Sequence, residues 1–312
     1  MVKRDDSTLN AQAQSAVEDR ARRILDRAAA WNRFPTPIDD IVAAANLRVA
    51  TSGIFDLENL LQYAKEKATS VVLTVKRAIS KLWGTYDAAE SIIHIDDTVA
   101  VVKQNFLKLH ETGHHEMPTH RKLFRFFQDC EKTLLPEVAD QFEREANNFA
   151  RFVLFQGDAF RRQAADQALN IKVPMRLSKN FGASIYASAR EYARTHHRAC
   201  VVYVLEPIKI TPGAPVIASV RRIEPSRSFL ARFGMPRDVT IGPTHALHSV
   251  LPIGRKMSQH QISIADVNGS GHECVAEAFD TTYNVLILVY PVSELTVVTT
   301  LGRKIVHISP LA

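Results

Sequence analysis

The sequence feature that most constrains this chain is the pentapeptide His110-Glu111-Thr112-Gly113-His114. Two histidines four positions apart lie about 40° apart around an α-helix and about 6 Å apart along it, so both imidazoles can reach one metal ion. Glu111 is turned by about 100° from His110, near enough to hold a water molecule beside the metal without ligating it. The pentapeptide therefore predicts a helix that carries half of a metal site.

Two further His-Glu pairs show that only one register satisfies the H-E-x-x-H pattern. His115-Glu116 would need a histidine at position 119, which is a threonine. His272-Glu273 would need one at position 276, which is an alanine. The metal-binding prediction therefore rests on one segment of the chain.

Length and composition describe an ordinary folded protein. A chain of 312 residues with 46% hydrophobic and 23% charged residues has room for two domains. The longest apolar runs are strand-sized, and the N-terminus has no apolar segment, so we expect neither a membrane span nor a secretory signal. Three cysteines, far apart at 130, 200 and 274, favour reduced thiols in the cytoplasm over disulfides or a cysteine metal site.

Hydrophobic periodicity predicts an α+β fold whose first part is mostly helical, with a small sheet. The predicted helices are 11–31, 38–45, 57–82, 101–115, 136–155 and 158–167. The predicted strands are 47–54 and the segments 84–87 and 91–96, which form either a hairpin or an edge strand that leads into the next helix. Pro118 is expected to end the helix that carries the pentapeptide. A strand alongside that helix would offer an edge to which a peptide substrate could add.

The second part of the chain begins with a predicted helix-turn-helix at 171–199, in which Gly182 makes the turn and Ser184 caps the second helix. Between 171 and 200 six Lys or Arg stand against one Glu, a net charge of +5 that suits phosphate contact. Such a motif is often a packing element, so nucleic-acid binding is not favoured. Short predicted strands then follow at 201–205, 216–220, 274–279, 283–290 and 295–300.

These patterns divide the chain into three predicted parts: a metallopeptidase-like domain at 1–170, the helix-turn-helix at 171–199, and a β-rich, mixed α/β domain at 200–312. The role of the last domain, whether sensing a ligand or recognising a substrate, is left open. The net charge of +6 suits a polyanion or an acidic partner as well as a solvated basic surface.

A third protein ligand is needed to complete the metal site. His120 lies six residues after His114, where H-E-x-x-H-x-x-G-x-x-H sites place a third histidine, but Met117 replaces their glycine. The alternative is a carboxylate on the predicted helix 136–155, either Glu143 or Glu145. Glu143 is favoured because an asparagine at 147, one turn on, could hydrogen-bond a ligand, whereas Glu145 has a phenylalanine there.

Two motifs together resemble the ImmA/IrrE family of zinc metallopeptidases. One is the pentapeptide, and the other is the run Glu143-Arg144-Glu145-Ala146-Asn147-Asn148-Phe149-Ala150, which is similar to that family's E-x-x-A-N-x-F-A helix. The resemblance covers roughly residues 15–200. Departures are Leu109 in place of a small residue and the ending Val153-Leu154-Phe155-Gln156 in place of a Leu-Leu-x-Pro-like one.

The resemblance implies that His110, His114 and Glu143 bind zinc and that Glu111 takes a proton from the attacking water. It also implies a zinc-dependent endopeptidase that makes a limited cut in a specific protein, an Xre-type repressor, and thereby controls stress-response or mobile-element genes. The alternative is a non-catalytic regulatory or toxin–antitoxin-type protein that binds a repressor, a toxin or DNA. The substrate-binding residues stay unassigned, and the residue that stabilises the oxyanion is undecided among His94, Tyr86, His115 and His120.

Overall fold

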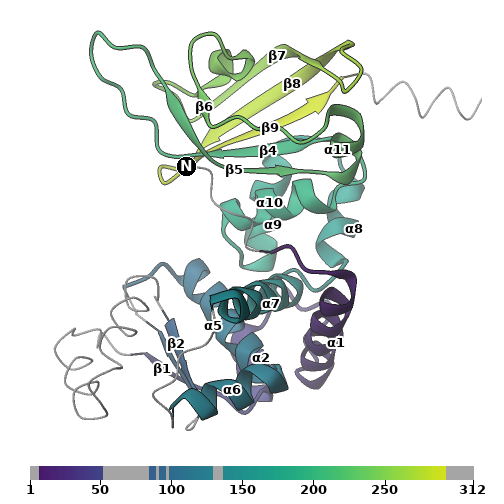
Figure 1. The fold of residues 1–312 in the computed structure, drawn as a ribbon, viewed down its shortest axis with the longest axis vertical. Helices are drawn as coiled ribbons and strands as arrows, with labels where there is room; N and C mark the ends of the chain where they lie inside the picture. Colours follow the sequence, from purple (N-terminus) through teal and green to yellow (C-terminus); the bar gives the residue numbers. More distant parts are fainter. Residues whose placement is uncertain (1–6, 52–83, 89–90, 96–97, 129–135, 293–312) are drawn as a thin grey trace, which may run out of the picture. The chain divides into compact units, whose positions relative to one another are not determined.

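The computed structural model describes residues 7–51, 84–88, 91–95, 98–128 and 136–292, which form two compact units (Figure 1). Within these residues the N-terminal unit comprises 7–159 with 179–184, and the C-terminal unit comprises 160–178 with 185–292. The predicted helix 57–82, the predicted strand 295–300 and the end of the predicted strand 47–54 lie outside the described residues. Among the described helices, none has the length and apolarity needed to cross a membrane.

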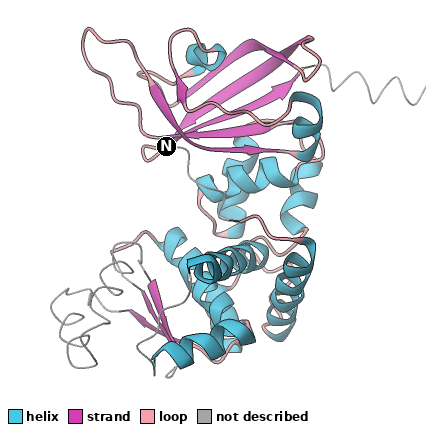
Figure 2. Ribbon diagram, viewed as in Figure 1, coloured by secondary structure: helices cyan, strands magenta, loops and turns pink. Residues whose placement is uncertain are grey.

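The N-terminal unit combines helices with a small three-stranded sheet (Figure 2). The strand order is β1-β3-β2, with β1 parallel to β3 and β2 antiparallel to it, so the predicted hairpin is confirmed. Its helices are α1 (Ala11–Arg27), α2 (Ile38–Ala44), α5 (Val101–Glu116), α6 (Pro118–Gln128) and α7 (Pro136–Leu154), and its strands are β1 (Arg48–Thr51), β2 (Gly84–Asp87) and β3 (Ile92–Ile95).

Helix α6 was not predicted from the sequence, in which Pro118 was read only as the end of the preceding helix. Helix α5 does end at Glu116, and Met117 adopts an extended conformation. Pro118 then begins α6, because a proline in the first position of a helix loses no hydrogen bond and already has a helical φ. The same residue therefore ends one helix and begins the next.

Helices α5 and α7 pack closely because α5 has a glycine where they meet. A Cβ atom on Gly113 would lie 3.0 Å from Cδ1 and 3.2 Å from Cβ of Phe149, which is fully buried. Leu109 on α5 and Ala146 on α7 are also fully buried. The absence of a side chain at Gly113 thus sets the separation of the two helices.

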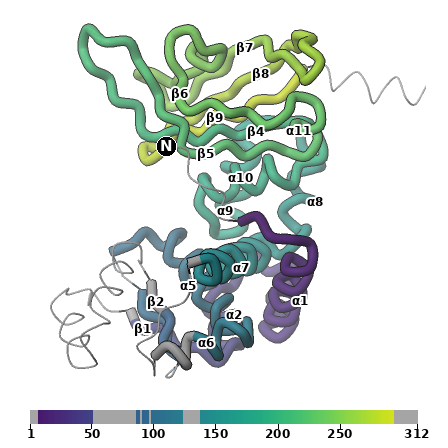
Figure 3. The backbone as a smooth tube through the Cα atoms, viewed as in Figure 1, coloured from purple at the N-terminus to yellow at the C-terminus, as the bar shows by residue number. Residues whose placement is uncertain are grey.

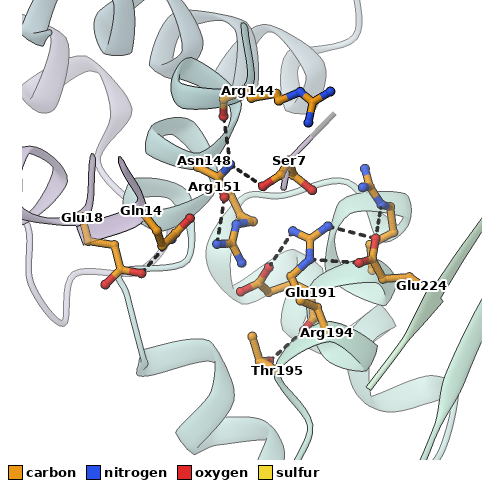
Figure 4. A network of polar contacts seen from close by, with 11 residues as sticks. Ser7, Gln14, Glu18, Arg144, Asn148, Arg151, Glu191, Arg194, Thr195 and Glu224 are labelled. Atoms are coloured by element: carbon orange, nitrogen blue, oxygen red, sulfur yellow. Dashed lines mark hydrogen bonds and ion pairs between the residues drawn. The ribbon is translucent and has the colours of Figure 1, made fainter. Parts of the chain in front are cut away.

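The side chain of Asn148 on α7 hydrogen-bonds the backbone just before α1 (Figure 4). The side-chain amide of Asn148 donates to the carbonyl oxygens of Ser7, at 2.7 Å, and of Arg144, at 2.9 Å. Its own oxygen accepts from the guanidinium of Arg151 at 3.1 Å. Asn148 is buried, so these bonds satisfy a polar group that would otherwise destabilise the fold.

Segment 171–199 contains two helices, α9 (Lys172–Phe181) and α10 (Ile185–Thr195), on either side of Gly182. Gly182 has φ of 67°, which favours glycine. Its carbonyl oxygen accepts from the side chain of Asn105 on α5 at 3.2 Å. The end of α9, with Phe181 fully buried, thereby belongs to the N-terminal unit, although α9 up to Ser178 belongs to the other unit.

The C-terminal unit is built on an antiparallel six-stranded sheet of order β6-β5-β4-β9-β8-β7. Figure 3 shows the first long strand of this unit, β4, beside the last, β9. The remaining elements are α8 (Ala159–Ala165), β4 (Val201–Leu205), β5 (Ala218–Pro225), α11 (Arg227–Phe233), β6 (Thr240–Ile241), a 3₁₀ helix η1 (Ala246–Val250), β7 (Met257–Ala265), β8 (Gly271–Asp280) and β9 (Val285–Pro291). Of these, α11, β6, η1 and β7 were not predicted.

Both faces of the central strands are buried, as the continuous apolar run of β4 predicts. One face forms a core with Phe229 of α11 and Leu247 of η1. On the other side, α10 packs against β4 and β5, where Glu224 binds the guanidinium groups of Arg190, at 3.0 Å, and Arg194, at 2.9 Å (Figure 4). These ion pairs attach α10 to the sheet.

We predict that Gly113→Val lowers the free energy of unfolding by about 2 kcal/mol or more, because the new side chain must displace Phe149 from a packed core. Chemical denaturation of the metal-free full-length protein measures this change. Gly242→Val is the matched control, since a Cβ there meets nothing within 4 Å. We expect the control to change stability by less than about 1 kcal/mol. Equal stability of the two variants would contradict the packing argument.

Candidate metal centre

The three ionisable residues of the pentapeptide are buried on helix α5. His110, Glu111 and His114 are all at most 7% exposed, so their charges are poorly solvated. The two histidines lie one helical turn apart, and their Nε2 atoms are 3.1 Å from each other. The helix therefore brings two potential ligand atoms to one point, as the four-residue spacing predicted.

Helix α7 brings a carboxylate to the same point. Glu143 Oε2 lies 3.4 Å from Nε2 of His110, and Oε1 lies 3.5 Å from Nε2 of His114. Within the described residues, these three side chains form the group of His, Cys, Asp and Glu with ligand atoms within 4.8 Å of one another. The Glu143 side chain is 56% exposed, so this side of the site opens to solvent. Two buried imidazoles and one solvent-facing carboxylate thus converge from two helices.

The separation of these ligand atoms fits a zinc ion. Zinc–nitrogen and zinc–oxygen bonds of about 2.0–2.2 Å in a tetrahedron place neighbouring ligand atoms roughly 3.3 Å apart. The three measured distances, 3.1, 3.4 and 3.5 Å, lie close to that value. Two imidazoles and a carboxylate also leave a fourth position open, as catalytic zinc sites do.

The ionisation of these groups reflects their burial and their proximity. Burial alone would lower the pKa of His110, but the hydrogen bond and charge of Glu143, together with Glu111, raise it to about 9. Burial lowers the pKa of His114 to about 4 and raises that of Glu111 to about 7. Burial would raise the pKa of Glu143, but hydrogen bonds and charge from the two histidines outweigh it. The pKa of Glu143 therefore falls well below its ordinary value. Without metal, one protonated histidine thus pairs with the Glu143 carboxylate.

Asn147 orients the first histidine. Its Oδ1 lies 3.1 Å from Nδ1 of His110, on the side of the ring opposite the Nε2 atom that faces Glu143. An amide oxygen can only accept, so Nδ1 of His110 carries the proton and Nε2 is left to bind a metal. The sequence analysis favoured Glu143 because Asn147, one turn on, could hydrogen-bond a metal ligand. In the structure Asn147 makes such a contact, with His110.

Glu145 and His120, the other two candidates for the third ligand, are bonded to each other instead. Glu145 Oε2 lies 2.8 Å from Nε2 of His120, and its Oε1 accepts from the amide of Gln141 at 2.6 Å. Nδ1 of His120 lies 3.1 Å from Nδ1 of His114. Neither residue belongs to the group of three at which the ligand atoms converge. This pairing was missed because nothing in the sequence placed α6 against α5.

The four candidates for oxyanion stabilisation occupy different environments. The two ring nitrogens of His120 are both engaged, as described above. The hydroxyl of Tyr86, on β2, lies 2.6 Å from Nδ1 of His115, and both side chains are buried. This bond joins the edge strand β2 to α5. His94 lies on the central strand β3, partly exposed.

The side chains that converge on this site are typical of one class of metal site. Two histidines of H-E-x-x-H, a glutamate from a second helix and a buried glutamate beside them are the kinds of residue that form a metallopeptidase site. Residues 74–190 match the family described as the IrrE N-terminal-like domain, Peptidase M78. This match confirms the predicted resemblance to the ImmA/IrrE family over these residues.

The remaining comparisons concern the fold alone. A Mycobacterium tuberculosis transcriptional regulator matches with a TM-score of 0.50 and 11% sequence identity, over 91% of this chain and 78% of that chain. This likeness supports the mixed α+β architecture that the sequence predicted. No curated protein shows significant sequence similarity to the chain.

We predict that Glu111→Gln stabilises the metal-free protein above pH 7. The folded state raises the pKa of Glu111 from 4.5 to about 7, so the wild type loses stability as pH rises through this window. One pKa unit corresponds to ~1.4 kcal/mol. The free energy of unfolding of the variant should therefore exceed that of the wild type by about 3 kcal/mol at pH 8 and by little at pH 4.5. Urea unfolding at both pH values measures the difference.

The control for this experiment is Glu137→Gln, which changes an exposed carboxyl on the same α7 helix that carries Glu143. We expect its stability to follow that of the wild type at both pH values. If Glu111→Gln stabilises the protein equally at pH 4.5 and pH 8, burial does not raise the pKa of Glu111.

Proposed function

We propose that this protein is a zinc-dependent endopeptidase that makes a limited cut in a specific protein. The observation that carries the proposal is the convergence of His110, His114 and Glu143, with ligand-atom distances of 3.1–3.5 Å, beside a buried Glu111 that takes no part in that convergence. The match of residues 74–190 to a metallopeptidase family supports the same reaction class.

In this proposal His110, His114 and Glu143 bind the metal, while Asn147 holds His110 in the required orientation. These residues would hold a zinc ion, which when bound would supply polarisation of the peptide carbonyl and a pKa of about 7 for its water. Glu111, with a pKa of about 7 in the metal-free site, accepts a proton from the attacking water and passes it to the leaving amine. A base whose pKa lies near the working pH is suited to both steps.

We propose the outer strand β2 as the place where the substrate backbone binds. Within the described part of the chain, β2 pairs on one side only, with β3, and it packs against α5. A peptide that binds beside the outer strand of a sheet can join that sheet as an added strand. We infer that the cleaved segment binds here in an extended conformation, with its scissile bond beside Glu111.

For the substrate, we propose an Xre-type helix-turn-helix repressor in the same cytoplasm, whose cleavage relieves repression of stress-response or mobile-element genes. The family resemblance is the support for this choice. Cys200 and Cys274 are buried free thiols, which is consistent with a reducing compartment. The C-terminal unit is proposed to recognise the substrate or to sense a ligand.

A second candidate is a non-catalytic regulator that binds DNA or a repressor. Its support is the similarity in fold to a transcriptional regulator and the exposure of Lys172, Arg176 and Lys179, which share one face of α9. On α10, however, Arg190 and Arg194 bind Glu224, so their charges are already paired. DNA affinity that falls steeply with salt, combined with metal binding but no cleavage, would favour this candidate.

We predict that Glu111→Gln reduces cleavage of the repressor by about 100-fold or more while the bound metal is retained, because Glu111 moves protons and does not ligate. The assay incubates purified full-length protein with candidate Xre-type repressors from the same genome and follows the products by mass spectrometry. Metal content is measured by elemental analysis. Glu137→Gln, an exposed change on α7, is the control and should cut at the wild-type rate.

Three outcomes separate the candidates. Loss of cleavage in Glu111→Gln with full metal content supports the proposed mechanism. Undiminished cleavage by that variant would rule out Glu111 as the base. Metal binding by the wild type with no cleavage of any neighbouring repressor would favour the non-catalytic regulator.

A further inference from the structure

His120 is a fully buried histidine directly behind the proposed metal site. It lies in the first turn of α6, and its Nδ1 atom is 3.1 Å from Nδ1 of His114. Its ring stacks on Phe142 of α7 with centroids 3.8 Å apart and planes 22° apart. Its other nitrogen, Nε2, is 2.8 Å from Glu145 Oε2. All of its polar atoms therefore have partners, and its orientation is determined by three neighbours.

The turn between α5 and α6 is what places His120 there. Met117 is extended and Pro118 begins the new helix, so α6 packs against α5. His120 contacts His114 on the Nδ1 side, whereas the metal would bind on the Nε2 side, which faces Glu143. His120 therefore lies on the wrong side of His114 to be a ligand itself. It contacts the nitrogen of His114 that does not face the metal site.

The hydrogen-bond chain has a single consistent direction when both rings are neutral. A histidine that binds a metal through Nε2 carries its proton on Nδ1. The two facing Nδ1 atoms can share only one proton, so His114 donates and His120 accepts. His120 then carries its own proton on Nε2, which donates to the carboxylate of Glu145.

Glu145 secures that direction because a carboxylate can only accept from His120. Both oxygens of Glu145 accept hydrogen bonds, one from Nε2 of His120 at 2.8 Å and the other from the side-chain amide of Gln141 at 2.6 Å. The carboxylate is 20% exposed and is held on both oxygens. Glu145 is therefore a well-oriented carboxylate acceptor at the end of the hydrogen-bonded series His114–His120–Glu145.

We propose that His120 and Glu145 are positioning residues that hold His114 in the tautomer whose Nε2 is free to bind the metal. The inference rests on the proposed metal site and adds two residues to it. On the other ligand, His110, the amide of Asn147 performs the same task with one residue. Carboxylate–histidine partners of this kind typically contribute 10- to 100-fold, as an order of magnitude, to metal affinity.

The test measures zinc affinity of the full-length protein by competition with a chromophoric chelator. We expect His120→Leu to bind zinc about 10- to 100-fold more weakly, because Nδ1 of His114 loses its acceptor. His120→Asn should recover most of this loss, since its Oδ1 can occupy the place of the His120 Nδ1 atom. Glu145→Leu should weaken binding about 10-fold, and Glu145→Gln, which retains an acceptor, by less than about 3-fold.

Two further measurements distinguish positioning from a structural role. Thermal unfolding of the metal-free variants shows whether a loss of affinity merely follows a loss of folding. If His120→Leu does not fold, the Glu145 pair, at a partly exposed position, supplies the same comparison. Nitrogen-15 NMR of the zinc-loaded protein should show His120 protonated at Nε2 and unprotonated at Nδ1. The opposite tautomer would overturn the proposal.

Glu143→Ala in the same assay separates this inference from the proposed function. If Glu143→Ala greatly weakens zinc binding while His120→Leu stays within about 2-fold of the wild type, the positioning proposal fails and the metal site stands. If Glu143→Ala leaves the affinity unchanged, the metal site itself is wrong and the positioning proposal falls with it.

Discussion

The close approach of α5 to α7 is the constraint on which the rest of the site depends. Gly113 has no side chain at the point where Phe149 packs, and a Cβ there would lie 3.0 Å from the phenyl ring. Because α5 carries both histidines and α7 carries Glu143, the spacing of the helices decides whether the three ligand atoms meet. Protein interiors are packed densely enough that one added side chain would move α7, and Glu143 with it.

The buried polar groups around this contact are nearly all satisfied by residues of the same two helices and of α6. His110 and His114 each use one nitrogen toward Glu143 and the other toward a partner, Asn147 or His120. Glu111 is buried among the same charges, and its pKa is raised to about 7. Burial that costs stability in the free protein thus brings the pKa of Glu111 near neutral pH, which suits the role of base that we propose for it.

Much of the helical framework could be predicted because it depends on local patterns. Helices 101–115 and 136–155 differ from α5 and α7 by one residue at the C-terminal end. The elements that were missed give weak local signals. Strand β7 is a largely exposed edge strand with many polar residues, α11 is a seven-residue helix, and α6 begins with a proline that is more often read as a stop.

The sequence alone was sufficient to select the register of the pentapeptide and its helix, because a four-residue spacing and the helical repeat are local properties. The helical pattern barely separates Glu143 from Glu145, since both border the apolar stripe of α7, and only the neighbouring Asn147 favoured Glu143. The tertiary structure distinguishes them. It places Glu143 against both histidines and gives Glu145 a different partner, His120, from a helix that only long-range packing could bring there. Contacts between residues far apart in the chain depend on how helices pack, and no local pattern encodes that.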